Sequence, residues 1–224
     1  MEPKNLELQL PYIAELDNIS DKEKQERLLI ARGAIGLIDN VNWPEEAQAR
    51  PISMFVAAYS HSGIYIQYMV RGRSLRAENT ADLSAVASDS CVEFFVEPHS
   101  NGHYWNFEFN CIGALNASHR TERHKPTRLS PAELASVKRY PSLGREPIPS
   151  TDGLHTWQLM VFIPFELIGL SWPLPTSIRA NFNKCGSATL EPHFLSWSPI
   201  ATAKPDFHRV EYFGKLIFEN TNIQ

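Results

Sequence analysis

Residues 104–111 read Tyr-Trp-Asn-Phe-Glu-Phe-Asn-Cys, and the five at the centre alternate strictly between polar and apolar side chains. Because successive side chains of a β-strand point to opposite faces, Phe107 and Phe109 would lie on one face and their polar neighbours on the other. This alternation predicts a strand that packs one face against a hydrophobic core and turns a polar face away from it.

Two other stretches divide in the same way. Residues 91–95 read Cys-Val-Glu-Phe-Phe, and residues 179–183 read Arg-Ala-Asn-Phe-Asn. In both, hydrophobic residues alternate with amides or charges, although asparagine and glutamate are poor strand formers. We call the polar side chains of the three strands the polar row: Glu93, Asn106, Glu108, Asn110, Arg179, Asn181 and Asn183.

The polar row has two explanations at this point. It could be the solvated face of an antiparallel sheet, although such faces usually favour threonine, lysine and serine. Alternatively it is a ligand site, because planar amides and carboxylates can pair with a donor and an acceptor on adjacent hydroxyls of a sugar. Both explanations place the polar row opposite the core.

The rest of the chain is mainly β in pattern. Strands are predicted at 52–59, 64–71, 90–97, 103–111, 154–163, 177–185 and 211–218, with a hairpin loop at 60–63 and a single turn at 164–168. The side chains expected in the core are Val92, Phe94, Phe107, Phe109, Leu159, Val161, Ala180 and Phe182.

Two helices are predicted from their capping residues. The first spans 21–32, with Ser20 and Glu23 as a capping box and Gly33 at its end, and we expect it to cover the end of a sheet. The second spans 131–139, capped by Ser130 with Pro131 at its first position.

These elements predict a single domain over residues 1–224. A lead-in with one helix occupies 1–42, and an antiparallel, jelly-roll-like β-sandwich with one or two short helices occupies 43–220.

Composition narrows the classes of function. The net charge is 21 − 25 = −4, which argues against a nucleic-acid partner or a membrane surface, because both need a basic face. No apolar run approaches the roughly 20 residues of a membrane span. The N-terminus lacks the apolar segment of a signal peptide, so we expect a cytoplasmic protein, unless a signal was removed.

The three cysteines show no disulfide or zinc-site spacing. Cys91, Cys111 and Cys185 are odd in number and far apart, so we expect buried, reduced thiols. We also expect Cys91 and Cys111 to lie near each other on the face of the polar row.

The C-terminal third supplies aromatic residues in proline-rich, loop-like segments. Residues 193–199 contain Trp197, and residues 205–209 contain Phe207 and His208. With Trp105, the aromatic residues could offer flat faces to a pyranose ring, or they could simply be core or rim residues.

Several blocks resemble family 9 carbohydrate-binding modules and their stand-alone bacterial relatives. The blocks are Val41–Pro44, Asp89–Phe95, Tyr104–Cys111, Arg179–Gly186, Pro192–Ile200, Pro205–His208 and Phe213–Gly214. They keep their order and cover about 43–218. The resemblance implies a sugar-binding β-sandwich of the kind found in polysaccharide-degrading systems.

The resemblance also implies a site. Polar sugar contacts of the family fall on Glu93, Glu108, Asn110, Asn181 and Asn183, which belong to the polar row. The family clamps the sugar between two tryptophans, and Val86 and Phe207 stand at those positions here. We therefore expect a polar floor with Trp197, Phe207 and His208 at its wall, and modest affinity.

No cofactor is expected. Some members of the family bind calcium, but no oxygen-rich D-x-D loop supports that here. Some related sandwiches bind haem through a methionine and a histidine, and no such pairing follows from the spacing of Met54, Met69 or Met160.

The predicted function is non-catalytic binding of a mono- or oligosaccharide, linked to carbohydrate catabolism. One alternative is a glycoside hydrolase, because Glu93 and Glu108 would lie about 5 Å apart if they face each other, as in retaining glycosidases. The other is an interaction domain with a degenerate sugar site.

Overall fold

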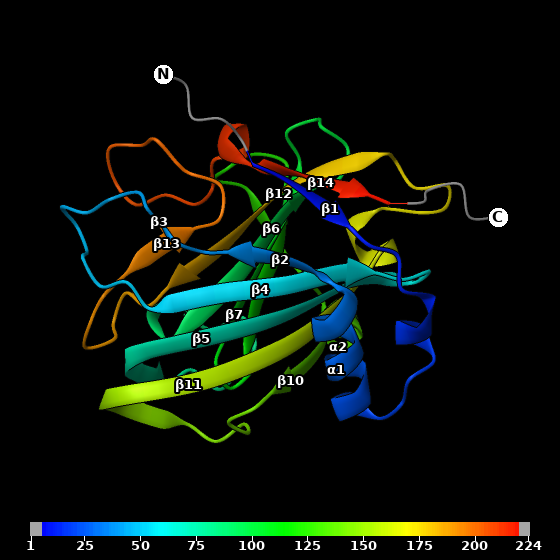
Figure 1. The fold of residues 1–224 in the computed structure, drawn as a ribbon. Coiled ribbons are helices and arrows are strands. Elements are labelled where there is room, and N and C mark those ends of the chain that lie inside the picture. Colours follow the sequence, from blue (N-terminus) through cyan, green and yellow to red (C-terminus); the bar gives the residue numbers. More distant parts are fainter. Residues whose placement is uncertain (1–5, 220–224) are drawn as a thin grey trace.

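A computed structural model describes residues 6–219, so residue 220, the expected end of the sandwich, lies outside the described part. Two sheets stack face to face (Figure 1). The first runs in the order β1 (Glu7–Leu10), β14 (Gly214–Phe218), β12 (Ser177–Cys185), β6 (Cys91–Glu97), β7 (Tyr104–Asn110), β8 (Leu115–Arg120) and β9 (Pro126–Arg128). Beside β12 it also carries β13 (Phe194–Ser196), which pairs with β3 (Asn40–Val41).

The second sheet has five strands. Their order is β10 (Lys138–Pro141), β11 (Ile148–Pro164), β5 (Gly63–Ala77), β4 (Ile52–Tyr59) and β2 (Ala34–Leu37). Short 3-10 turns lie at η1 (Ala14–Asp17), η2 (Val86–Ser88), η3 (Glu166–Ile168) and η4 (Val210–Tyr212). The mainly β sandwich is confirmed, and its named strands pair antiparallel except for the parallel pair β1–β14.

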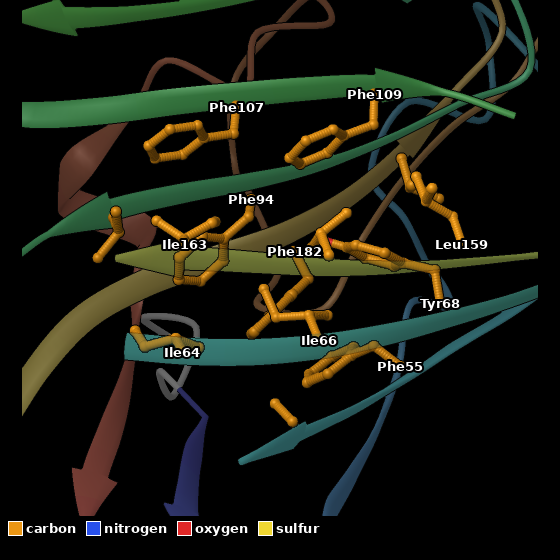
Figure 2. Packing of buried hydrophobic residues seen from close by; sticks show 14 of the residues in the cluster. Phe55, Ile64, Ile66, Tyr68, Phe94, Phe107, Phe109, Leu159, Ile163 and Phe182 are labelled. Carbon is orange, nitrogen blue, oxygen red and sulfur yellow. The ribbon is translucent and has the colours of Figure 1, made fainter. Parts of the chain in front are cut away.

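The core lies between the sheets. Figure 2 shows the phenylalanines of β6, β7 and β12 facing Phe55, Ile64, Ile66 and Tyr68 of the second sheet. Phe55 stacks on Phe182 with ring centroids 3.6 Å apart. All eight predicted core residues are buried, because the period of two in each strand fixes which side chains face the opposite sheet.

The lead-in is part of both sheets, which the sequence pattern did not predict. Strand β1 pairs with β14 at the edge of the first sheet, and β2 pairs with β4 at the edge of the second. These two strands are only four residues each, and the partner of β1 lies near the other end of the chain.

Helix α1 (Lys22–Arg32) is capped by Asp21, not by the expected Ser20. The Asp21 carboxylate accepts a hydrogen bond from the backbone N–H of Lys24 at 3.2 Å. Gly33 ends the helix as expected, with its N–H donating to the carbonyl of Leu29. Leu29 packs against the outer face of β4 and β5, so the helix covers a sheet face rather than a sheet end.

Helix α2 (Pro131–Ser136) is three residues shorter than predicted. The capping box of Ser130 and Glu133 is present. Residues 138–141 instead form β10, because they pair with β11 as an edge strand.

The segment 197–213 crosses the outer face of the first sheet. It is held there by the side chain of Asn181, which bonds to Ser198, and by Arg179, which donates to the carbonyl of Val210. In the described part of the chain, no helix is long and apolar enough to cross a membrane.

Candidate functional site

The polar row lies on the outer face of the first sheet, and all of its residues except Arg179 are buried. Glu93 of β6 sits directly across from Glu108 of β7 on one side and from Asn183 of β12 on the other. Glu93 and Glu108 are only 2% and 7% exposed, because the segment 197–213 and the loop before β13 cover this face. The solvated-face explanation is therefore wrong.

Two amides of the row hold the backbone. Asn181 receives a hydrogen bond from the backbone N–H of Ser198 at 2.9 Å and donates to the carbonyl of the same residue at 3.0 Å. The side-chain oxygen of Asn110 accepts a hydrogen bond from the N–H of Ala114, and this bond closes the turn between β7 and β8. The side-chain nitrogen of Asn110 donates to the carboxylate of Asp89. These two side chains have used their hydrogen-bonding groups within the protein.

Glu93 is surrounded by groups that keep its proton. Its Oε1 accepts from the thiol of Cys185 at 3.1 Å, and its Oε2 accepts from Asn183 at 3.2 Å. Burial raises the pKa of Glu93 well above its usual range, and the Cys185 and Glu108 groups raise it further. The hydrogen bond from Asn183 opposes this rise, and in its acid form Glu93 can donate a hydrogen bond as well as accept one.

The carboxyl group of Glu108 has a more polar environment than that of Glu93. Its carboxylate oxygens accept from Asn106 at 2.9 Å and from Asn116 at 2.8 Å. Burial raises the pKa of Glu108, while the Asn116 bond, the charge of Arg120 and the Asn106 bond oppose this. The two carboxyl groups thus face each other in different surroundings.

A cavity of about 300 Å³ opens over this pair. Its lining comes from the sheet, from the loop after β12 and from the C-terminal segment: Ala87, Glu93, Phe95, Glu108, Arg123, Cys185, Ser187, Phe194, Pro205, Asp206, Phe207 and His208. Of the eight predicted site residues, it brings together Glu93, Glu108, Phe207 and His208. A larger hollow of about 560 Å³ lies beside α1 on the other sheet, away from the polar row.

The wall of the cavity is aromatic. Phe207 is half-buried and meets Trp43 edge-on, with ring centroids 5.6 Å apart. His208 lies over Phe95 at 4.8 Å, and its Nδ1 is 3.0 Å from the hydroxyl of Tyr104. Burial, with the nearby arginines, lowers the pKa of His208 to about 3, so the ring is neutral at physiological pH.

An ion pair closes one side. Arg123, in the loop between β8 and β9, contacts Asp206 of the C-terminal segment at 2.8 Å. A guanidinium beside a carboxylate presents both donors and acceptors to a ligand in the cavity.

The other predicted residues lie elsewhere. Trp197 is buried in the core, edge-on to Phe182 at 5.7 Å, and does not line the cavity. Trp105 packs on His119, far along β7. Asn183 contacts Glu93 but lies beneath the cavity surface, and its Oδ1 has no partner among the described residues.

Sequence reasoning missed several lining residues. Phe95 and Cys185 share the parity of the polar row, so the period of two could have found them. Arg123 and Asp206 come from loops and carried no such signal.

The cysteine pairing also differs from the expectation. All three cysteines are free thiols, as expected. However, Cys91 lies across from Cys185, whereas Cys111 belongs to the core. Cys111 continues the parity of Phe107 and Phe109, which places it on the core face.

The fold and site define a β-sandwich protein with a small, partly aromatic cavity on the outer face of one sheet. The family model of Carbohydrate-binding family 9 matches residues 22–218, and the chain belongs to this family.

Solved structures agree with this assignment. A proposed carbohydrate-binding protein from Bacteroides uniformis is 32% identical, with a TM-score of 0.88, over 96% of this chain and 100% of that one. A family 9 module from Caldicellulosiruptor kristjanssonii, solved with glucose, has a TM-score of 0.60 at 11% identity over 96% of both chains. Its complex with cellotriose has a TM-score of 0.58 at 12% identity, over 96% of this chain and 94% of that one. None of the curated proteins matches the chain.

Proposed function

We propose that this chain is a non-catalytic carbohydrate-binding protein that takes a monosaccharide, or the end of an oligosaccharide, into the cavity over Glu93 and Glu108. The observation that carries this proposal is the cavity itself, with two buried carboxyl groups on its floor and Phe207 on its wall. Family membership supports the same ligand class.

The chemistry of the lining suits a sugar. The carboxyl groups and the Arg123–Asp206 pair supply donors and acceptors for hydroxyls, and Phe207 supplies an apolar face for the C–H groups of the ring. A volume of about 300 Å³ is at the low end for ligand pockets, which favours one sugar ring over a long chain.

Affinity should be modest. One aromatic wall and a few hydrogen bonds correspond to dissociation constants from about micromolar to millimolar, or about −8 to −4 kcal/mol. Glucose and cellotriose, the ligands of the Caldicellulosiruptor module, are the first sugars to test.

The test is calorimetry against a panel of mono- and oligosaccharides. Phe207→Ala and Glu108→Gln should each weaken binding, the first by removing the apolar face and the second by changing a floor carboxyl that Asn106 and Asn116 orient. Phe162→Ala is the matched control, because Phe162 is half-buried on the other sheet. If the wild type binds no sugar at millimolar concentration, or if Phe207→Ala binds as well as wild type, the proposal is wrong.

Hydrolysis is the second candidate activity, since Glu93 and Glu108 are direct cross-strand partners. Facing carboxyls of unequal surroundings are what a retaining glycosidase uses as acid and nucleophile. Release of sugar from chromogenic glycosides, lost in Glu108→Gln, would favour the enzyme. Binding without turnover would favour the binding protein.

A role in carbohydrate catabolism and a cytoplasmic location are part of the proposal. The three free, buried thiols support a reducing compartment.

A further inference from the structure

Three potential metal ligands converge beneath the sugar cavity. Cys91 of β6 lies across from Cys185 of β12, and Glu93 follows Cys91 on the same face of β6. Their ligand atoms all lie within 4.8 Å of one another, and the Cys185 Sγ is 3.1 Å from the Glu93 Oε1. All three residues are at most 2% exposed.

The spacing suits a tetrahedral cation. Zinc binds cysteine sulfur at about 2.3 Å and carboxylate oxygen at about 2.0–2.2 Å, which puts two sulfurs of one site about 3.8 Å apart. Two thiolates and one carboxylate form a mixed soft and hard ligand set that favours zinc over calcium or magnesium. Because the three residues lie on two adjacent paired strands, the backbone already holds them in place.

No ion pair neutralises the cluster among the described residues, although the charge of the buried Lys184 opposes the rise in pKa of Cys91 and Cys185. Neither Glu93 nor Glu108 belongs to an ion pair among the described residues. The neighbouring Lys184 belongs to the opposite face of β12, where its Nζ contacts the carbonyl of Cys185 and the Nε2 of His193. Burying acidic groups together is costly unless they stay protonated or bind a cation.

The pKa values of the cluster oppose metal binding, because the ligands must lose their protons to a bound cation. Burial raises the pKa of Cys91 to about 11, and the adjacent Cys91 thiol together with burial raises the pKa of Cys185. Burial also raises the pKa of Glu93, so cation binding at this cluster should strengthen as the pH rises.

A further observation concerns Asn183. This amide is fully buried, its Nδ2 donates to the Oε2 of Glu93, and its Oδ1 is a buried acceptor with no partner among the described residues. Such an amide is a typical outer-shell group, which orients a ligating carboxylate and leaves an acceptor for a metal-bound water. Glu93 and Cys185 also line the cavity, so the cluster is open on one side.

We propose that Cys91, Glu93 and Cys185 form a binding site for zinc or a similar divalent cation, with its fourth coordination position facing the cavity. The site goes beyond sugar binding and does not rest on it. Binding exchanges the protons of the two thiols and the carboxyl for one dication, and no oxidant or reductant takes part.

The experiment is a titration of the reduced protein, in a non-thiol reductant, with zinc and with cadmium as a spectroscopic probe. One equivalent of cadmium should bind and produce the ultraviolet charge-transfer absorption of cadmium thiolate. Cys185→Ser and Cys91→Ser should each weaken binding by about tenfold or more, since even outer-shell changes act in that range. Cys111→Ser is the matched control, because it alters a buried thiol that belongs to the core.

A second measurement does not depend on variants folding. X-ray absorption of the zinc-loaded wild type should show two sulfur neighbours at about 2.3 Å. No binding by the reduced wild type, a zinc shell without sulfur, or equal loss in Cys111→Ser would overturn the proposal. Phe207→Ala should bind zinc like wild type, so failure of the metal site and failure of the sugar site give different results.

Discussion

Glu93 is a buried acid on the floor of the cavity. Its carboxyl group contacts a thiol and an amide, faces a second carboxyl, and lies under a cover of aromatic residues. Folding therefore favours the acid form of Glu93, because burial raises its pKa well above the ordinary value. In the unfolded chain the pKa of the same group lies near its ordinary value of 4.5.

This difference makes a prediction about stability and pH. Because the folded pKa of Glu93 is raised, its contribution to stability is complete below 4.5 and is lost as the pH rises toward the folded pKa. Glu93→Gln keeps a neutral group, whose oxygen can accept from Cys185 and whose NH₂ can donate to a rotated Asn183 amide. Glu93→Gln should therefore gain stability over wild type by about 1.4 kcal/mol per pH unit above 4.5, until the folded pKa is reached.

Urea unfolding between pH 4 and pH 8, with a chelator present, measures this gain. A difference between wild type and Glu93→Gln that stays constant across this range would show that Glu93 is ionised in the folded protein.

At the scale of elements, the C-terminal segment is attached to β12 by Asn181 at its start and by Arg179 near its end. Asn181 makes hydrogen bonds to both the N–H and the carbonyl of Ser198, which lies at the start of the segment that carries Phe207 and His208. The cavity wall is thus attached to the strand that also supplies Asn183 and Cys185.

Removing that attachment should loosen the wall. Asn181→Ala leaves the buried backbone N–H of Ser198 without its partner, at a cost of about 1–3 kcal/mol, while the carbonyl of Ser198 still accepts from the hydroxyl of Ser196. Limited proteolysis should then cut within 198–212, and sugar affinity should fall. Asn110→Ala is the matched variant, since Asn110 is an equally buried amide of the polar row that closes the β7–β8 turn instead. Equal proteolysis of both variants would contradict this role of Asn181.

The core strands allow a simpler prediction. Phe109 of β7 is completely buried between the sheets, so Phe109→Ala should lower the free energy of unfolding by about 3–5 kcal/mol. Phe162→Ala should cost less, because Phe162 is only half-buried on the outer face of β11. Denaturant unfolding of both variants tests the assignment of faces, and a larger loss for Phe162→Ala would contradict it.

The faces of β6, β7 and β12 could be predicted from the sequence because a period of two is a local property. The same rule, applied strictly, places Cys111 in the core with Phe109. The place of Phe207 and His208 beside the polar row was expected from the family resemblance and not from a local pattern, since the covering contacts, such as Phe95 to His208, join residues far apart in the chain. The burial of Trp197 against Phe182 in the core also had no local signal in the sequence.

At the scale of the whole molecule, both outer faces of the sandwich are partly covered. Helix α1 packs on β4 and β5, and the segment 197–213 packs on β6 and β12 (Figure 1). This explains why β6 is buried on both faces and β5 over most of its first half. The covering segments bury titratable groups, so stability should depend on pH at both ends of the range.

The pH dependence of stability below neutral pH gives the last prediction. Burial lowers the pKa of His193 and of His208 to about 3 each, from a usual value of 6.5. Because the folded pKa of each histidine is lowered, its contribution to the free energy of unfolding is complete above pH 6.5. This contribution is lost as the pH falls toward 3. Each histidine should therefore add a slope of about 1.4 kcal/mol per pH unit between these values.

In His208→Asn, the side-chain oxygen replaces Nδ1 as the partner of the Tyr104 hydroxyl but does not titrate. This variant should lose one histidine's share of the slope, and His155→Asn, a substitution outside the cavity, is the control. Urea unfolding at several values of pH from 4 to 7 measures both slopes, and identical slopes for His208→Asn and wild type would mean that His208 is not buried as a neutral ring.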